Sequence, residues 1–254
     1  MPSDPLHAGA NAGTPRLFAL VPCAGAGARA GVNVPKQYSV LAGRAVVSHT
    51  LHALARVDRL AAILVVLSAD DTLFDRACAE FKGWVARCGG ATRAISVRQG
   101  LEELSRRGAQ EHDWVLVHDA ARCLIRPMWV DRLIDACIDD PVGGLLAVQV
   151  ADTLKLEAHG RVAQTLDRTG KWAAQTPQMF RLGLLRQALR DAGPAVTDEA
   201  SAVEAVGHAP RLVPGSAENI KVTWPEDLEL AARLLSSAPR LNGRADSNAP
   251  ETAQ

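Results

Sequence analysis

The chain has 254 residues, of which 48% are hydrophobic and 22% charged, as is typical of a globular protein with a sizeable core. Its 28 basic and 28 acidic side chains give a formal net charge of zero, which argues against a nucleic-acid-binding surface or a membrane-binding polybasic patch. No apolar run reaches the roughly 18 residues that a membrane span requires. We therefore expect neither nucleic acid nor a membrane as a partner.

The cysteine content favours a reducing compartment. Five cysteines are present, an odd number, and they lack C-x-x-C spacing and accompany no signal peptide: Cys23, Cys78, Cys88, Cys123 and Cys137. A disulfide framework is therefore not expected, and we predict a cytoplasmic protein in which these side chains are small, mostly buried apolar groups.

A single domain is expected over residues 16–237. Residues 1–15 are rich in glycine, alanine and proline without periodicity, and residues 238–254 are polar, so both ends are predicted to be disordered.

Within the domain, short apolar runs alternate with longer amphipathic stretches, which predicts a mostly parallel sheet flanked by helices. The apolar runs predict buried strands at 16–21, 61–68, 114–118 and 144–150. Helices are predicted at 44–56, at 96–107 with a capping box opening at Ser96, and at 223–237 with a capping box opening at Thr223.

One segment breaks this alternation. Residues 146–168 show partial period-2 alternation on either side of His159-Gly160, which predicts a β-hairpin that projects from the sheet as an arm over about 146–172. An isolated hairpin is marginally stable in water, so we expect the arm to pack on a second subunit in a homodimer.

The loop "VPCAGAGARAGVNVPKQY" at 21–38 follows the first strand and so lies at the carboxyl edge of the sheet, where α/β proteins bind ligands. It is not a Walker A loop, because no glycine directly precedes Lys36 and no Ser or Thr follows it. It satisfies the glycine spacing of a dinucleotide fingerprint, but no acid follows until Asp58, so the expected ribose-binding carboxylate is missing.

A nucleoside triphosphate fits this loop better. Residues 5–57 contain five cations and no acid, including Arg29 and Lys36 on the loop itself. Lysine is scarce in a chain with 28 basic residues, and a lysine at position 36 indicates a need for a compact point charge. The alternative is that the glycines only turn the chain and the cations are solvated.

Other segments add groups suited to a triphosphate. Asp119 follows the strand 114–118 and could hold Mg²⁺ or cap a turn, whereas His118 is expected to pack at the strand end. The glycine pair in "GGATRAISV" at 89–97 allows close approach of a base or ribose. His49 and His52 lack a third metal ligand, and no signature of a catalytic nucleophile occurs.

Taken together, the motifs resemble the 2-C-methyl-D-erythritol 4-phosphate cytidylyltransferase family over residues 17 to about 235. The resemblance rests on eight motifs in the family's order: "PCAGAGAR" with "PKQY", "GGATRAISV", "VHDAAR", "DTLK", "LDRTGKW", "QTPQMF", "TDEASAVE" and "NIKVTWPEDL". It implies a Rossmann-like nucleotidyltransferase fold and a homodimer built through the β-arm. It also implies transfer of CMP from CTP to the substrate phosphate, with Mg²⁺ as cofactor and release of pyrophosphate.

The resemblance also implies roles for particular residues. Arg29 and Lys36 would stabilise the transition state, Asp119 would hold the metal, and Arg168 and Lys221 would position the attacking phosphate. Thr153 and Thr197 would complete the methylerythritol phosphate site, with Thr153 and Arg168 reaching the partner's active site on the arm. The CTP-binding set would be Pro22, Cys23, Ala24, Gly25, Gly27, Gly90, Ser96 and Ala120.

The sequence departs from the family's usual pattern at Cys23, Ala30 and Ala91, which leaves loop closure and base selectivity open. Ribitol 5-phosphate is the alternative substrate within the same family. More distant alternatives are a sugar-phosphate or molybdopterin nucleotidyltransferase, and a non-catalytic nucleotide sensor.

Overall fold

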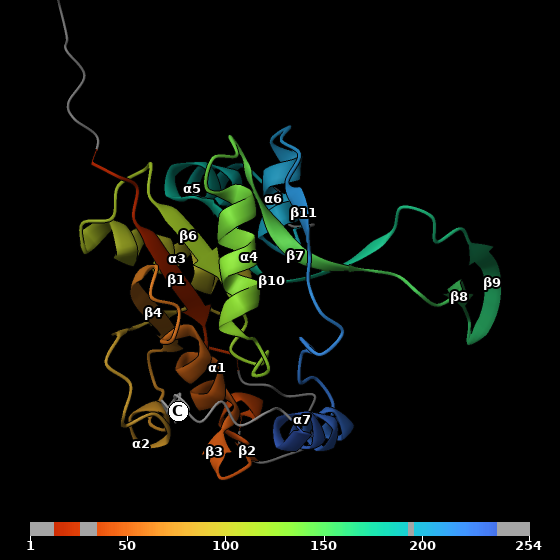
Figure 1. Cartoon of the computed structure of the whole chain (residues 1–254), viewed down its shortest axis with the longest axis horizontal. Coiled ribbons are helices and arrows are strands. Elements are labelled where there is room, and N and C mark those ends of the chain that lie inside the picture. The colour runs from red at the N-terminus through yellow and green to blue at the C-terminus, as the bar shows by residue number, and fades with distance from the viewer. Residues whose placement is uncertain (1–12, 26–34, 193–195, 238–254) are drawn as a thin grey trace, which may run out of the picture.

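A computed structural model of the chain describes residues 13–25, 35–192 and 196–237. Gly27, Arg29, Ala30 and nearly all of the two termini predicted to be disordered lie outside these ranges, so those predictions stay predictions. The described part is built around one seven-stranded sheet flanked by helices (Figure 1).

The sheet has the strand order β11-β7-β10-β6-β1-β4-β5. Every neighbouring pair is parallel except the two pairs made by β10, which confirms the predicted mostly parallel sheet. The strands are β1 (Leu17–Pro22), β4 (Leu60–Ser68), β5 (Trp84–Gly89), β6 (Trp114–Val117), β7 (Gly143–Gln149), β10 (Trp172–Arg181) and β11 (Arg211–Pro214).

Successive side chains of β1 point to opposite faces of the sheet, and each face carries its own part of the hydrophobic core. Ala19 and Val21 pack with the apolar sides of α1 and α4, whereas Phe18 and Leu20 pack with α3, α5 and α6. Figure 1 shows α4 in front of the sheet and α3 and α5 behind it. The helices are α1 (Val46–Leu54), α2 (Phe74–Ala77), α3 (Arg93–Arg106), α4 (Pro127–Cys137), α5 (Leu182–Asp191), α6 (Glu199–Ala205) and α7 (Pro225–Ser237).

Strand β10 lies in the middle of the sheet although it contains Pro177. Proline cannot donate to a strand ladder, and the pairing of β10 with β7 shifts register between Ala174 and Gln178. This irregularity brings Thr176 to the carboxyl end of β6, where its hydroxyl accepts a hydrogen bond from the Asp119 amide.

The predicted hairpin is confirmed. β8 (Leu154–Ala158) and β9 (Arg161–Leu166) pair antiparallel and form a sheet of their own. Both turn residues have positive φ, 54° at His159 and 75° at Gly160, as a tight two-residue hairpin turn requires. Figure 1 shows this arm projecting from the ends of β7 and β10, away from the sheet.

All three predicted helix starts differ in the structure. The helix predicted from residue 44 begins at Val46, because Arg44 and Ala45 form a short strand. α3 begins at Arg93, because Thr92 is its N-cap and accepts the amide of Ile95 at 3.2 Å. The predicted Ser96 capping box is therefore wrong. At the start of α7, the Asp227 carboxylate accepts the amides of Thr223 and Trp224, so the predicted pairing of Thr223 with Glu226 is wrong as well.

The short elements beside the opening loop complete the fold. They are the 3-10 helix η2 (Lys36–Tyr38) and the two-residue strands β2 (Val40–Leu41) and β3 (Arg44–Ala45), which pair antiparallel ahead of α1. α7 packs on this region through the buried Ala231. No helix in the described part of the chain is long and apolar enough to cross a membrane.

The cysteines are mostly buried, as predicted, with Cys88 half-buried. Burial raises the pKa of the thiols of Cys78, Cys123 and Cys137 to about 11, so these side chains are neutral at physiological pH.

Candidate active site

A pocket of about 170 Å³ lies at the carboxyl end of β1 and β6. Its lining includes nine of the residues that the resemblance assigned to CTP binding, catalysis or metal binding, together with Lys221: Pro22, Cys23, Ala24, Gly25, Lys36, Gly90, Ser96, Asp119 and Ala120. Four separate stretches of sequence therefore meet at one edge of the sheet, where the general rule for open α/β sheets places a ligand.

Gln37 holds the loop that follows β1. Its buried amide nitrogen donates to the carbonyl oxygens of Gly25 at 2.8 Å and Cys23 at 3.3 Å. Gln37 directly follows Lys36 in η2, so these bonds tie the stretch that contains Lys36 to the glycine loop. Gln37 has no role in the sequence prediction beyond excluding a Walker A loop, so its contacts with the glycine loop were not predicted.

Cys23 contributes to the pocket without a reactive thiol. Burial raises the pKa of the thiol well above its usual range, although a hydrogen bond with Tyr38 opposes the rise. The Cys23 amide donates to the carbonyl of Val66 at 2.8 Å and so extends the pairing of β1 with β4. The side chain therefore packs in the core.

The glycine pair at the end of β5, Gly89 and Gly90, packs tightly against its neighbours. A Cβ on Gly89 would lie 2.3 Å from the Cβ of Ala24 and 2.7 Å from the Leu67 carbonyl oxygen. The Gly90 amide donates to the Ser96 hydroxyl at 3.1 Å. The glycines thus allow the β5–α3 turn to lie directly against the glycine loop.

We expect Gly89→Ala to lower the free energy of unfolding by about 1–3 kcal/mol, the usual cost of overpacking a tight site. The methyl group also pushes on Ala24, so we expect the KM for CTP to rise. Urea unfolding and initial-rate kinetics measure the two effects. If both quantities match the unsubstituted protein, the two segments have more room than the structure indicates.

Asp119 lines the pocket, and its carboxylate contacts two cations closely. Its Oδ1 accepts from Arg93 Nε at 2.7 Å, and its Oδ2 lies 2.8 Å from Lys221 Nζ. Burial favours the neutral acid, but the two cations outweigh burial and hold the pKa of the Asp119 carboxyl well below its usual range. Asp119 is therefore ionised at neutral pH.

Lys221 reaches Asp119 because two loops pair through their backbones. The Val222 amide donates to the Ala121 carbonyl at 2.9 Å, and Arg122 Nη1 donates to the Asn219 carbonyl at 2.6 Å. The loop after β6 is fixed from the other side by the Thr50 hydroxyl, which donates to the Ala120 carbonyl at 2.9 Å.

Arg93 was not assigned from the sequence. Besides Asp119, it binds Glu199 through two short bonds, Nη1 to Oε1 at 2.6 Å and Nη2 to Oε2 at 2.9 Å. Glu199 is 1% exposed, so a charge is buried at the first residue of α6. Arg93 thus links the metal-binding candidate to α6. The available signal was the arginine in "GGATRAISV" together with the acids of "TDEASAVE".

His118 is a buried packing residue, as expected from its sequence position. Thr176 accepts the Asp119 amide and so directs its own proton to His118 Nδ1, which leaves Nε2–H to donate to the Arg122 carbonyl. Burial lowers the pKa of His118 from its usual 6.5 to about 4. The ring is therefore neutral at pH 7.

This shift predicts an acid-sensitive stability. Between pH 6.5 and 4 the unfolded chain binds a proton at His118 that the folded chain does not. As the pH is lowered from 6.5 to 4, the free energy of unfolding therefore decreases, by about 3 kcal/mol in all. In His118→Asn we expect a shallower fall. Urea unfolding of both proteins at half-unit pH steps in metal-free buffer measures the difference. Parallel curves would contradict a neutral buried histidine.

Three predicted site residues lie outside the pocket. Thr153 and Arg168 are exposed at the base of the arm and do not line the pocket. Thr197, just before α6, is also exposed, and its amide donates to the Ser201 hydroxyl at 3.1 Å. The part of the chain that the structure describes therefore does not bring the predicted methylerythritol phosphate residues together within one subunit, apart from Lys221.

The histidine pair on α1 gives no metal site. His49 Nε2 donates to the Leu41 carbonyl at 2.7 Å. Among residues 13–25, 35–192 and 196–237, no group of three or more His, Cys, Asp or Glu side chains could hold a metal ion. A metal at Asp119 would therefore need most of its ligands from substrate and water.

Residues 17–237 match the sequence pattern that defines the 2-C-methyl-D-erythritol 4-phosphate cytidylyltransferase family. The chain belongs to this family. Membership makes it a cytidylyltransferase of isoprenoid precursor synthesis and favours methylerythritol phosphate over ribitol 5-phosphate as its substrate.

Individual sequence relatives support the same family membership. The chain is 54% identical over 231 residues to the 2-C-methyl-D-erythritol 4-phosphate cytidylyltransferase of Burkholderia multivorans, covering 89% of this chain and 98% of the relative. It is 60% identical over 223 residues to the bifunctional enzyme IspD/IspF of Albidiferax ferrireducens, covering 87% of this chain but 53% of that enzyme. The chain thus spans about half the length of this bifunctional relative.

Solved structures share the fold. A crystal structure of 4-diphosphocytidyl-2C-methyl-D-erythritol synthase superposes with a TM-score of 0.78 at 42% identity, covering 87% of this chain and 98% of the other. The Thermus thermophilus 2-C-methyl-D-erythritol 4-phosphate cytidylyltransferase superposes with a TM-score of 0.73 at 30% identity, covering 87% and 99%.

Proposed function

We propose that CMP transfer takes place in the pocket around Asp119 and that the active site is completed by the arm of a second subunit. The observation that carries this proposal is the division of the predicted residues. Lys36, Asp119 and Lys221 line one pocket, whereas Thr153 and Arg168 lie exposed on the arm.

The reaction joins two anions. A phosphate oxygen of the substrate attacks the α-phosphorus of CTP, a new P–O bond forms there, and the bond between the α-phosphorus and the bridging oxygen breaks to release pyrophosphate. The nucleophile is already an anion, so no general base is needed. Charge neutralisation and alignment are the main tasks of the protein.

The cations of the site divide these tasks. Lys36 and Arg29 stabilise the negative charge of the α-phosphoryl group in the transition state. Lys221 and the partner's Arg168 align the attacking phosphate, and Thr153 and Thr197 bind the polyol. The backbone from Pro22 to Gly27, with Gly90, Ser96 and Ala120, receives CTP.

Asp119 would supply one carboxylate ligand to Mg²⁺, and the other ligands would have to come from CTP and water. Mg²⁺ is commonly bound by one or two carboxylates, with phosphate oxygens and water as the other ligands, and Asp119 supplies one ionised carboxylate. Both of its oxygens contact a cationic group, Arg93 Nε at 2.7 Å and Lys221 Nζ at 2.8 Å, so a metal held there would share the carboxylate with these two side chains. When bound, the metal neutralises charge on the phosphates.

A pyrophosphate-release assay tests the activity. CTP, UTP, ATP and GTP are each combined with methylerythritol phosphate and with ribitol 5-phosphate, with Mg²⁺ or Mn²⁺. We expect release with CTP and methylerythritol phosphate. Release only with ribitol 5-phosphate, or with none of the pairs, would contradict the proposal, and the second result would favour a nucleotide sensor.

Light scattering tests the assembly. The arm carries two exposed apolar side chains, Leu156 at 49% and Val162 at 63%, which a partner subunit would cover. We expect a dimer at micromolar concentration. A variant in which residues 154–166 are replaced by a short Gly-Ser linker is expected to be a folded monomer. A monomeric full chain would remove the proposed role of the arm.

A further inference from the structure

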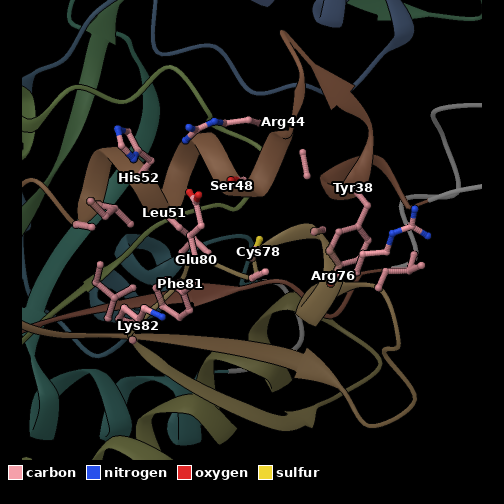
Figure 2. A pocket seen from close by; sticks show the side chains of 18 of the residues that line it. Tyr38, Arg44, Ser48, Leu51, His52, Arg76, Cys78, Glu80, Phe81 and Lys82 are labelled. Carbon is pink, nitrogen blue, oxygen red and sulfur yellow. The ribbon is translucent and has the colours of Figure 1, made fainter. Parts of the chain in front are cut away.

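A second and larger pocket, of about 880 Å³, lies on the α1 side of the sheet (Figure 2). Its walls come from α1, from the first half of β4 and from the segment between α2 and β5. It shares no lining residue with the pocket around Asp119. Its volume lies in the range of small-molecule sites.

The interior of this pocket is apolar. Leu51 and Leu54 of α1 and Ile63 of β4 form its inner wall, and Phe81 closes one side. Two large apolar side chains at its edge, Val40 at 75% and Leu73 at 40% exposure, face solvent. An apolar interior that continues into an exposed apolar rim is characteristic of a ligand groove.

Cations outnumber acids around this interior. Arg44, Arg76 and Lys82 line the pocket with one acid, Glu80, which gives a formal balance of three minus one, or +2. In Figure 2, Arg44 lies on the α1 side, Arg76 beside Tyr38, and Lys82 beside Phe81. All three cations are exposed, and none forms an ion pair with another residue in the described ranges.

We propose that this pocket binds an amphipathic anion, that is, a ligand with an apolar chain and a phosphate or carboxylate head group. The chain would cover the Leu51, Leu54 and Ile63 wall, and the head group would pair with a cation of the rim, which Figure 2 shows on separate sides of the pocket. A neutral apolar ligand gains nothing from the cations, and a small anion gains nothing from the wall.

The pocket is connected to the active site through η2. Tyr38 lines the large pocket, and its hydroxyl donates to Asp71 Oδ2 at 2.5 Å. Lys36 and Gln37, in the same three-residue helix, line the Asp119 pocket. Because Tyr38 and Lys36 belong to the same short helix, we infer that occupancy of the large pocket changes the affinity for CTP. This coupling, unlike the binding itself, rests on the proposed function.

Isothermal titration calorimetry on the full chain, without nucleotide, tests the binding. The probe is decyl phosphate, below its critical micelle concentration, and decanoate tests the carboxylate head. We expect both to bind at one site, and we expect 1-decanol and inorganic phosphate each to bind at least about tenfold more weakly. Equal binding of decanol would overturn the anion selectivity, and no binding of either anion would overturn the site.

Variants place the binding in this pocket. Arg44→Gln, Arg76→Gln and Lys82→Gln combined are expected to weaken decyl phosphate binding about tenfold or more, since hydrogen bonds to charged groups are lost. Arg56→Gln, an exposed cation close by that does not line the pocket, is the matched control and is expected to leave binding unchanged. Ala79→Phe, at an exposed lining position, is expected to weaken binding by occupying part of the pocket.

Unchanged binding in both the triple variant and Ala79→Phe would overturn the location. Thermal unfolding of each variant verifies that it is folded. For the coupling, the titration is repeated with saturating CTP, and reciprocity requires the decyl phosphate affinity to shift by the same factor as the CTP affinity does with decyl phosphate present. If CTP binds and neither affinity shifts, the coupling is refuted while the proposed function stands.

Discussion

Replacing Lys36 with alanine is expected to lower kcat by a factor of about 10² or more, with a smaller effect on the KM for CTP. Lys36 lines the Asp119 pocket from η2 and belongs to the acid-free segment 5–57. Its charge is needed most where negative charge accumulates at the α-phosphorus, which is in the transition state. Pyrophosphate release under saturating substrate measures the change.

Arg56→Ala is the control for this prediction. Arg56 is a cation of the same acid-free segment, is exposed and does not line the pocket, so its removal should leave kcat unchanged. Arg29→Ala is expected to resemble Lys36→Ala. Near-normal turnover in Lys36→Ala would show that the cation assigned to the transition state is the wrong one.

Replacing Arg93 with alanine is expected to lower the free energy of unfolding by about 3–5 kcal/mol. The substitution leaves Glu199, which is 1% exposed, without the guanidinium that binds both of its oxygens. It also removes one of the two cations that hold the pKa of Asp119 low. Guanidinium unfolding measures the stability, and we expect kcat to fall as well because the carboxylate is no longer held in place.

Two further variants separate these effects. Arg106→Ala removes an exposed arginine from the last turn of the same helix and is expected to cost at most about 1 kcal/mol. Arg93→Met combined with Glu199→Met replaces the buried pair by apolar groups and is expected to recover most of the stability but not the turnover. If Arg93→Ala lowers the free energy of unfolding by no more than Arg106→Ala does, the ion pair between Arg93 and Glu199 does not stabilise the fold.

The parts of the fold that were predicted depend on local patterns. Buried strands of apolar residues, such as 61–68, and the hairpin turn at His159-Gly160 are specified within a few residues, and the structure confirms them. The edge strand β5 has the sequence WVARCG, which is too polar to indicate a buried strand. β10 contains a proline, which argues against a central strand until the register shift beside it is known.

In the candidate site, too, residues in short local motifs could be predicted, whereas contacts between distant parts of the chain could not. The glycine loop, Asp119 and Lys221 could be assigned because each belongs to a short motif that resembles the family. The bond between Arg93 and Glu199 joins residues 106 positions apart, and no local pattern indicates it. The predicted start of α3 was wrong because Thr92 and Ser96 are both good cap residues. In the structure Thr92 is the cap, and Ser96 lies inside the helix, where its hydroxyl donates to the Thr92 carbonyl.

The division of the site between two subunits is tested most directly by mixing two inactive variants. Lys36→Ala has an intact arm, and Arg168→Ala has an intact pocket. After the two are unfolded together and refolded in equal amounts, about half of the dimers are mixed, and one of the two sites in each mixed dimer has both residues. We predict that the mixture recovers about one quarter of the unsubstituted activity. A mixture no more active than the average of the two variants would show that each active site is completed by its own chain.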